Sequence, residues 1–253
     1  MLFYVKRSLL FFVTGLLPVL LLFVYVRRPI MTGNLTKQTV YLWLLNSFHI
    51  KDSHREPTFM LIDDDSGIGI FKIHEICERI GVKATYAVVP ALLDSIRCDS
   101  LKAWHREGYG IALHGYNHGR WKEWTYNEIV DDIQRSIAFM EEHEIASSEL
   151  IRMVVTPGSN NTYVIRKAIN NQGMKMVMGA NIINPDTTTF QFGRMFITKE
   201  TDMIQVRDIL ECAKAENGFV IFGTHSSNPD EFSEDKTETV LRMAVEMGFK
   251  LKN

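Results

Sequence analysis

Short apolar runs alternate with amphipathic stretches along most of the chain. The short runs have the length of buried strands, whereas the longer stretches repeat apolar residues at helical spacing. Thr125 and Glu128 form a capping-box signature at the start of one such stretch. In order, the pattern predicts strand Phe59–Ile62, helix Ile70–Ile80, strand Ala84–Val89, helix Cys98–Glu107, strand Ile111–Leu113, helix Tyr126–His143, strand Arg152–Val155, helix Thr162–Gln172, strand Lys175–Met178, an irregular stretch to Phe196, helix Val206–Glu216, strand Phe219–Phe222 and helix Thr237–Met247, before Phe249–Leu251. Such alternation is typical of α/β folds with a parallel sheet or barrel.

The N-terminal region has a different pattern. Ser8–Val26 is a charge-free stretch of 19 residues, about 28 Å long as a helix and close to the hydrocarbon thickness of a bilayer. Arginines and a proline follow it instead of a small-residue cleavage site, which favours an uncleaved single-pass anchor over a signal peptide. Basic residues flank both ends, so the positive-inside rule hardly orients the span. We expect a membrane anchor in residues 1–30, a linker with a short apolar helix in residues 31–56, and one domain in residues 57–253.

Composition narrows the function classes. The chain has 253 residues, 46% of them hydrophobic, and a formal net charge of -2, so no basic excess points to nucleic acid. The three cysteines cannot all pair with one another, and they form no CxxC motif. We therefore assign them no chemistry.

Candidate chemistry follows two of the predicted strands. Phe59–Ile62 leads directly into Asp63, Asp64 and Asp65, and Ile111–Leu113 leads into His114 and His118. The carboxyl ends of parallel strands meet at one edge of a sheet, where the sites of α/β folds gather. Two imidazoles and a carboxylate form a ligand set that leaves a coordination position open for water, as a metal-dependent hydrolase requires.

These segments in this order resemble the polysaccharide deacetylase (NodB-homology) family of carbohydrate esterases, and the resemblance extends over about Pro57–Leu251. Besides the aspartates and the H-x-x-x-H motif, G-V-K-A-T-Y-A-V-V-P at residues 81–90 looks like the family's second-strand segment, and F-V-I-F-G-T-H-S ends a late strand with His225. The resemblance implies an irregular (β/α)7-type barrel and hydrolysis of an N-acetyl group, less readily an O-acetyl group, on a cell-surface or lipid-linked glycan. It also implies a divalent ion, with zinc the first choice.

The resemblance implies roles for single residues. Asp63 would be the base and Asp64, His114 and His118 the metal ligands, because the spacing from Asp63-Asp64 to the second strand fits this register better than Asp64-Asp65 does. Strand alternation alone sends neighbouring aspartates to opposite faces and does not say which face holds the metal. His225 would be the general acid.

Substrate contacts are expected from residues near these motifs, namely Tyr116, Trp121, Pro157 and Gly158. The sequence also departs from the family pattern. An arginine usually precedes the proline-aromatic-glycine turn of the third motif and orients the base, but this chain reads V-V-T-P-G-S, and Arg152 lies two residues too early. The tryptophan-bearing fourth motif has no clear counterpart between Asn181 and Asp208.

Two other classes of function remain open. An apolar strand that ends in aspartates also resembles the metal-binding signature of nucleotide-sugar glycosyltransferases, although that interpretation leaves the three histidines unexplained. The missing arginine favours a second alternative, an inactive deacetylase-like module that binds glycan. For the catalytic interpretation, we expect an acetylated glycan as substrate, no nucleic-acid partner, and a single-pass membrane protein with its domain outside the cytoplasm.

Overall fold

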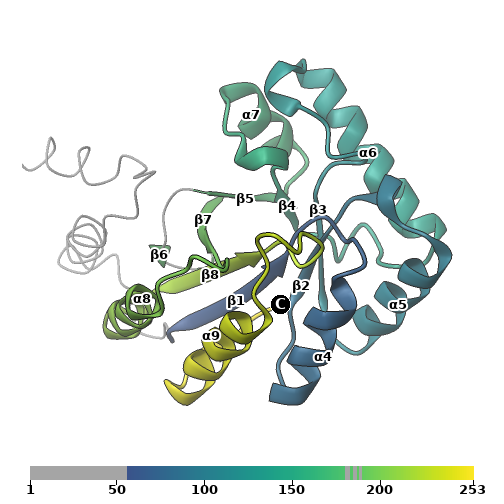
Figure 1. Ribbon diagram of the computed structural model, residues 1–253. Coiled ribbons are helices and arrows are strands. Elements are labelled where there is room, and N and C mark those ends of the chain that lie inside the picture. The colour runs from purple at the N-terminus through teal and green to yellow at the C-terminus, as the bar shows by residue number, and fades with distance from the viewer. Residues whose placement is uncertain (1–55, 180–182, 185–186, 188–189) are drawn as a thin grey trace, which may run out of the picture.

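The computed structural model describes residues 56–179, 183–184, 187 and 190–253. Parallel strands close into a barrel, and helices surround it as an outer layer (Figure 1). The predicted anchor and the linker up to Arg55 lie outside the described residues. Within the described part, no helix is long and apolar enough to span a bilayer.

Seven parallel strands make the barrel, and this confirms the (β/α)7-type fold. Their order around the barrel is β1-β2-β3-β4-β5-β7-β8, and β8 pairs with β1 to close it. Short strand β6 adds antiparallel to β8, and β9 adds to β1. The strands are β1 Thr58–Asp63, β2 Thr85–Val88, β3 Gly110–Leu113, β4 Met153–Val155, β5 Lys175–Gly179, β6 Ile183–Asn184, β7 Gln191–Phe196, β8 Phe219–Thr224 and β9 Lys250–Leu251.

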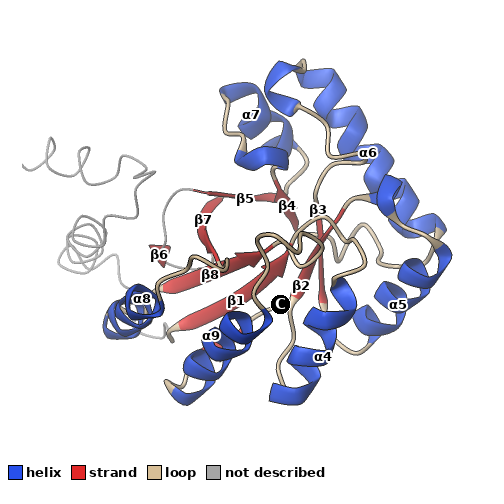
Figure 2. Ribbon diagram, in the orientation of Figure 1, coloured by secondary structure: helices blue, strands red, loops and turns tan. Residues whose placement is uncertain are grey.

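The helices connect these strands and lie outside them (Figure 2). Side-chain caps set most of their starts: the predicted capping box at Thr125 and Glu128 forms, and Asp94, Asp202 and Ser233 each accept a backbone N–H of the first turn. The last three caps start their helices three residues before the predicted positions. The helices are α4 Ile70–Ile80, α5 Ser95–Arg106, α6 Tyr126–Glu142, α7 Tyr163–Asn171, α8 Met203–Ala215 and α9 Glu234–Glu246.

Two separate hydrophobic clusters show which side of each strand faces the barrel axis. The smaller cluster takes residues from every barrel strand and from no helix, so it fills the barrel; its buried members are Met60, Ile62, Ala87, Ala112, Val155, Val177, Phe192, Phe219 and Ile221. The larger cluster joins the other strand faces, such as Phe59 and Leu61, to the helices. Even-numbered residues of β1 therefore point into the barrel, and odd-numbered residues point toward the helices.

Candidate metal and catalytic site

The aspartates and histidines singled out in the sequence meet at the carboxyl end of the barrel. His114 follows β3, His225 follows β8, and Nε2 of each lies within 3.6 Å of an Asp64 carboxylate oxygen. Because parallel strands end at the same edge, residues far apart in the sequence are brought together here without a long loop.

Asp63 lies on the helix-facing side of β1 and is fully buried. Its carboxylate accepts hydrogen bonds from the Thr224 hydroxyl at 2.7 Å and from the Ser226 backbone N–H and hydroxyl at 2.9 and 2.6 Å. Burial raises the pKa of Asp63 to about 7 in spite of these donors. Asp63 thus connects β1 to the two residues that flank His225, and it points away from the barrel axis.

Asp64 continues the row of barrel-facing positions Met60 and Ile62. It is 1% exposed, and both of its oxygens accept from Arg194, each at 2.6 Å. Burial alone would raise the pKa of Asp64, but the charge of the Arg194 guanidinium, assisted by its hydrogen bonds and by His225, outweighs it and holds the pKa below its usual range. Asp64 is therefore ionised at neutral pH.

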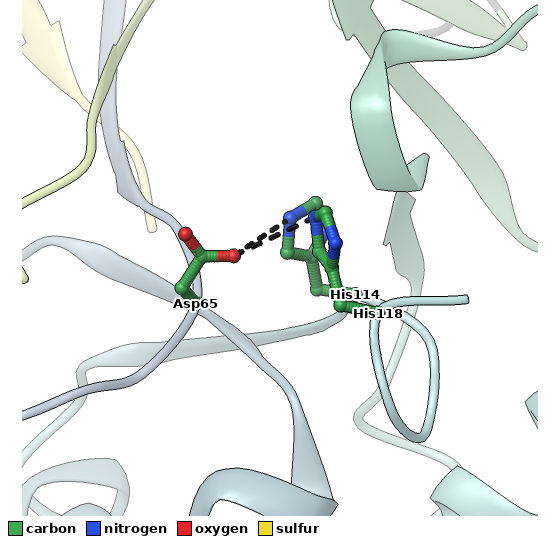
Figure 3. A group of neighbouring side chains, drawn as sticks. All are labelled: Asp65, His114 and His118. Atoms are coloured by element: carbon green, nitrogen blue, oxygen red, sulfur yellow. Dashed lines mark ion pairs between the residues drawn. The ribbon is translucent and has the colours of Figure 1, made fainter. Parts of the chain in front are cut away.

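Asp65, His114 and His118 form a group whose ligand atoms all lie within 4.8 Å of one another. Figure 3 shows the Asp65 carboxylate facing both imidazoles, with Oδ1 3.4 Å from Nε2 of His114 and 3.6 Å from Nε2 of His118. Asp65 and His118 adopt positive φ angles of 72° and 55°, and such conformations in non-glycine residues are concentrated at functional sites.

His114 is oriented for a ligand that the protein itself does not supply. Its Nδ1 lies 2.8 Å from the carbonyl oxygen of Val155, which can only accept, so Nδ1 carries the proton. Nε2 is left as a buried acceptor, and it makes no hydrogen bond within the described part of the chain. A backbone carbonyl on one nitrogen and an open lone pair on the other is the usual arrangement of a metal-bound histidine. The residues present therefore fit a divalent ion held by Asp65, His114 and His118.

The geometry differs from the register preferred on sequence grounds. Asp65, and not Asp64, lies in the ligand group, whereas Asp64 has both oxygens engaged by Arg194. The arrangement matches the alternative register, in which Asp64 and Asp65 form the functional pair.

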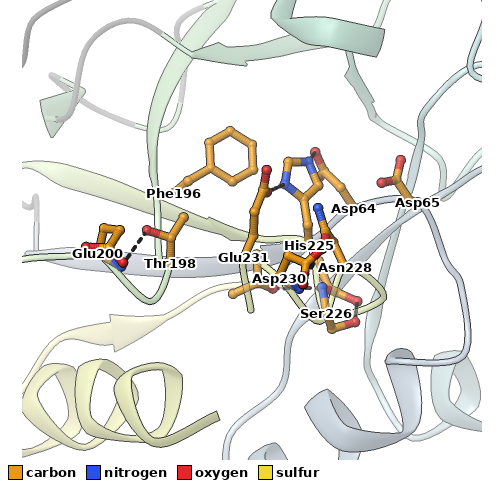
Figure 4. Close-up of polar contacts among 12 residues, drawn as sticks. Asp64, Asp65, Phe196, Thr198, Glu200, His225, Ser226, Asn228, Asp230 and Glu231 are labelled. Carbon is orange, nitrogen blue, oxygen red and sulfur yellow. Dashed lines mark hydrogen bonds and ion pairs between the residues drawn. The ribbon is translucent and has the colours of Figure 1, made fainter. Parts of the chain in front are cut away.

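His225 lies beside Asp64 between an aromatic ring and a second carboxylate (Figure 4). The Phe196 ring stacks on the imidazole at 4.6 Å with an interplanar angle of 16°, and Nδ1 lies 3.0 Å from Oε2 of Glu231. The contact with Asp64, opposed by desolvation and assisted by Glu231, raises the pKa of His225 to about 8. His225 is thus mainly protonated at neutral pH.

The loop that carries the histidine pair is held by Asp132 of α6, a residue that the sequence did not single out. One oxygen of this buried carboxylate accepts from the Tyr116 N–H at 2.9 Å and from the Trp121 indole at 3.2 Å. Gly115 has φ 74°, and a Cβ there would approach both Pro157 and Asp132, so glycine suits this turn.

The predicted substrate-contacting residues differ in accessibility. Trp121 is fully buried with its indole bound to Asp132, so it offers no face to a sugar and its expected role does not fit the structure. Pro157 is also buried, whereas Gly158 is exposed. Tyr116 is half-buried, and the Arg135 guanidinium lies 3.6 Å from its ring centroid. Tyr116 and Gly158 remain as surface positions beside the histidine loop.

Arg194 is another residue that the sequence did not single out. It lies in β7, within the stretch that shows no clear periodicity, and the neighbouring residues of that strand gave no motif. Arg152, the nearest arginine to the expected third motif, instead precedes β4 and lines a cavity of about 400 Å³ at the amino ends of the strands, together with Thr85 and Phe219. It lies at the opposite end of the barrel from Asp64.

Comparisons with known proteins bear on the family and the fold of the chain. The polysaccharide deacetylase family profile matches residues 51–177. No curated protein sequence shows significant similarity to the chain. Among solved structures, a family 4 acetyl xylan esterase from Clostridium thermocellum in complex with a cobalt ion has a TM-score of 0.57 and 13% identity, over 77% of this chain and 87% of that one.

Two further structures show the same fold. The esterase family 4 domain of a xylanase from a Trinervitermes trinervoides hindgut metagenome has a TM-score of 0.54 at 16% identity, over 78% of this chain and 87% of that one. A family 4 pseudoenzyme from Bacillus anthracis has a TM-score of 0.54 at 18% identity, over 78% and 63% of the two chains. With a family profile that extends over half of its length and a barrel shared with these family 4 structures, the chain belongs to the polysaccharide deacetylase family of hydrolases.

Proposed function

We propose that this protein removes N-acetyl groups from a glycan with the help of a divalent metal ion. The observation that carries the proposal is the group formed by Asp65, His114 and His118, with Asp64 and His225 beside it. Three protein ligands leave a coordination position open, and one carboxylate with two imidazoles suits zinc. The cobalt ion in the Clostridium thermocellum structure supports a divalent ion in this fold.

When bound, such an ion supplies a Lewis acid that acidifies water and polarises a carbonyl. The side chains around it divide the proton transfers. Asp64 is ionised and accepts a proton from the attacking water, and Arg194 keeps its carboxylate in one orientation. We therefore propose Asp64 as the base and Asp65 as the third ligand of the metal ion.

His225 supplies the proton that the leaving group needs. Its pKa, raised to about 8 by the contact with Asp64, keeps it protonated at neutral pH. An amine leaves an amide only when its nitrogen is protonated, whereas an alkoxide of a sugar needs this help less. The protonated histidine therefore favours N-acetyl over O-acetyl substrates, although the related acetyl xylan esterase makes O-acetyl groups the first alternative to test.

An inactive glycan-binding module is the second candidate, because structures of similar fold include a pseudoenzyme. The base, ligand and acid positions of this chain are all filled by residues that suit their roles, and this favours turnover. The family membership likewise disfavours a glycosyltransferase, which would have no use for the three histidines.

We further propose that the substrate is a cell-surface or lipid-linked glycan and that the barrel works at the outer face of a membrane. The support is the charge-free stretch Ser8–Val26 in the sequence, which has the length of a bilayer span.

Acetate release tests the function. The full-length chain, purified in detergent, is incubated with N-acetylglucosamine oligomers and with acetylated xylan oligomers, and its metal content is measured on the same sample. We expect about one divalent ion per chain and faster release from the N-acetyl substrate. Metal without release from either substrate would support the binding module, and a chain that binds no divalent ion would contradict the proposed site.

A further inference from the structure

Strand β7 carries two residues on the same side that each contact one of the proton-transfer groups. Arg194 binds Asp64, and Phe196 stacks on His225. Residues two apart in a strand point to the same face, and Phe192 places this face inside the barrel.

The contact between Arg194 and Asp64 orients the Asp64 carboxylate. A guanidinium that donates two parallel hydrogen bonds fixes the plane of a carboxylate as well as its charge. Both bonds are 2.6 Å long, and both side chains are 1% exposed. A base fixed in this way keeps one orientation while the substrate enters.

The two β7 residues also contact each other. The Arg194 guanidinium carbon lies 4.4 Å from the centroid of the Phe196 ring. The same ring stacks on the imidazole of His225, and the two rings are nearly parallel. The Phe196 ring therefore contacts both the arginine that binds Asp64 and the histidine proposed as the acid.

Strand β8 leaves room for these two β7 side chains at Gly223, which pairs with Phe196. A Cβ at this position would lie 3.1 Å from Cε1 of Phe196 and 3.4 Å from Cδ of Arg194. Only a residue without a side chain leaves both neighbours where they are. This glycine is an independent sign that the barrel accommodates Arg194 and Phe196 in these positions.

We infer that β7 is the positioning strand of this active site, with Arg194 orienting the base Asp64 and Phe196 orienting the acid His225. The inference rests on the proposed function. It places the support of the base on a different strand from the third motif, where this chain has Thr156 and no arginine.

Two substrates separate the two roles. An N-acetylglucosamine oligomer needs both a base and an acid, whereas 4-nitrophenyl acetate has a leaving group that departs without a proton, so it needs the base alone. The variants Arg194→Ala, Arg194→Lys and Phe196→Leu are made in the full-length chain, and Arg152→Ala, at the far end of the barrel, is the matched control.

We expect Arg194→Ala to lower kcat about 10- to 100-fold on both substrates, with little change in KM and with the metal retained. Added guanidinium should restore part of this loss, and Arg194→Lys should lie between the two because it keeps the charge without the paired bonds. Phe196→Leu should lower kcat for the N-acetyl substrate and spare the ester. Arg152→Ala should behave as the wild type.

The outcomes also separate this inference from the proposed function. If the wild type is active and Arg194→Ala keeps its kcat on both substrates, or if Phe196→Leu affects both substrates equally, the positioning role is overturned while the function stands. A loss of metal and fold in Arg194→Ala that guanidinium does not reverse, with Arg194→Lys fully active, would make the arginine a structural residue only. A wild type that acts on neither substrate contradicts the function, and the inference falls with it.

Discussion

Three adjacent carboxylates at the end of β1 differ in what surrounds them. Asp63 faces hydroxyl and amide donors, Asp64 faces a guanidinium, and Asp65 faces two imidazoles. Chemically identical side chains therefore differ in protonation and in binding partners, because both depend on the neighbouring groups.

The first prediction tests the proposed roles of Asp64 as base and Asp65 as metal ligand by substitution. Asp65→Asn should lose the metal, because it removes one of three protein ligands, whereas Asp64→Asn should keep the metal and lose about 10²- to 10⁴-fold in kcat. Elemental analysis and acetate release on the same preparations check both expectations. Should Asp64→Asn lose the ion and Asp65→Asn keep it, the register preferred from the sequence would hold and the base would be Asp63.

The second prediction concerns the pH dependence set by His225. As an acid it must be protonated, so kcat/KM for the N-acetyl substrate should fall as the pH rises through about 8, the pKa of His225. Glu231 accepts from Nδ1 and stabilises the protonated ring. Glu231→Gln should therefore lower the pKa and move the alkaline limb to lower pH.

Asp230→Asn is the control for this experiment, because it removes a charge from the same loop without touching His225. The pH–rate profiles of the wild type, Glu231→Gln and Asp230→Asn show whether Glu231 sets the position of the alkaline limb. An alkaline limb that stays in place in Glu231→Gln would show that another group sets it.

At the scale of elements, the end of β1 is tied to the end of β8 through Asp63. The two strands pair along their whole length, from Thr58 with Phe219 to Asp63 with Thr224. The loops beyond them also touch closely: a Cβ on Gly69 would lie 2.2 Å from the Ser226 backbone. Asp63 and this close approach together fix the position of His225.

The third prediction follows from this tie. Asp63→Ala would leave the buried hydroxyl of Thr224 and the N–H of Ser226 without their acceptor and should lower the free energy of unfolding by about 1–3 kcal/mol. Asp63→Asn should be milder, since an amide oxygen replaces the acceptor of both groups. Denaturant unfolding of the two variants measures the difference. Equal losses in both would show that the charge of Asp63, and not its hydrogen bonds, matters.

The elements also show how far the sequence could predict this site. The spacing of apolar residues and the residues that begin or end each element predicted most helices and strands, and the H-x-x-x-H motif located the histidine loop. The sequence could not tell which of Asp63 and Asp64 points into the barrel. A strand that is apolar on both faces does not reveal which face lies inside, so this assignment required the two hydrophobic clusters of the folded chain.

Strand β7 was missed for a related reason. Its sequence Q-F-G-R-M-F contains an arginine and a glycine at positions that become buried, and such residues lower the expectation of a strand. The burial of Arg194 is offset by Asp64, which is 130 residues away in the sequence. A pairing over that separation leaves no periodic signal, so it becomes visible only in the fold.

At the scale of the whole molecule, the residues assigned to chemistry gather at one end of the barrel, and the described chain begins at the other. β1 starts at Thr58 beside Phe219, the first residue of β8, and runs toward the aspartates at its far end. An anchor joined through residues 31–56 would therefore attach at the amino end and leave the site free to face a substrate.

The last prediction tests this anchoring. The full-length chain should stay with membranes after washes with high salt and with alkaline carbonate, because Ser8–Val26 contains no charge across the length of a bilayer core. Leu17→Arg places a charge near the middle of that stretch, at a cost of about 2.5–3.5 kcal/mol for insertion, and should release a larger share of the protein. Protease added to intact and then to permeabilised cells reports the side: digestion in intact cells, or after opening only an outer envelope, places the barrel outside the cytoplasm. Wild-type protein removed by salt alone would rule out the span, and digestion only after the inner membrane is opened would place the barrel on the cytoplasmic side.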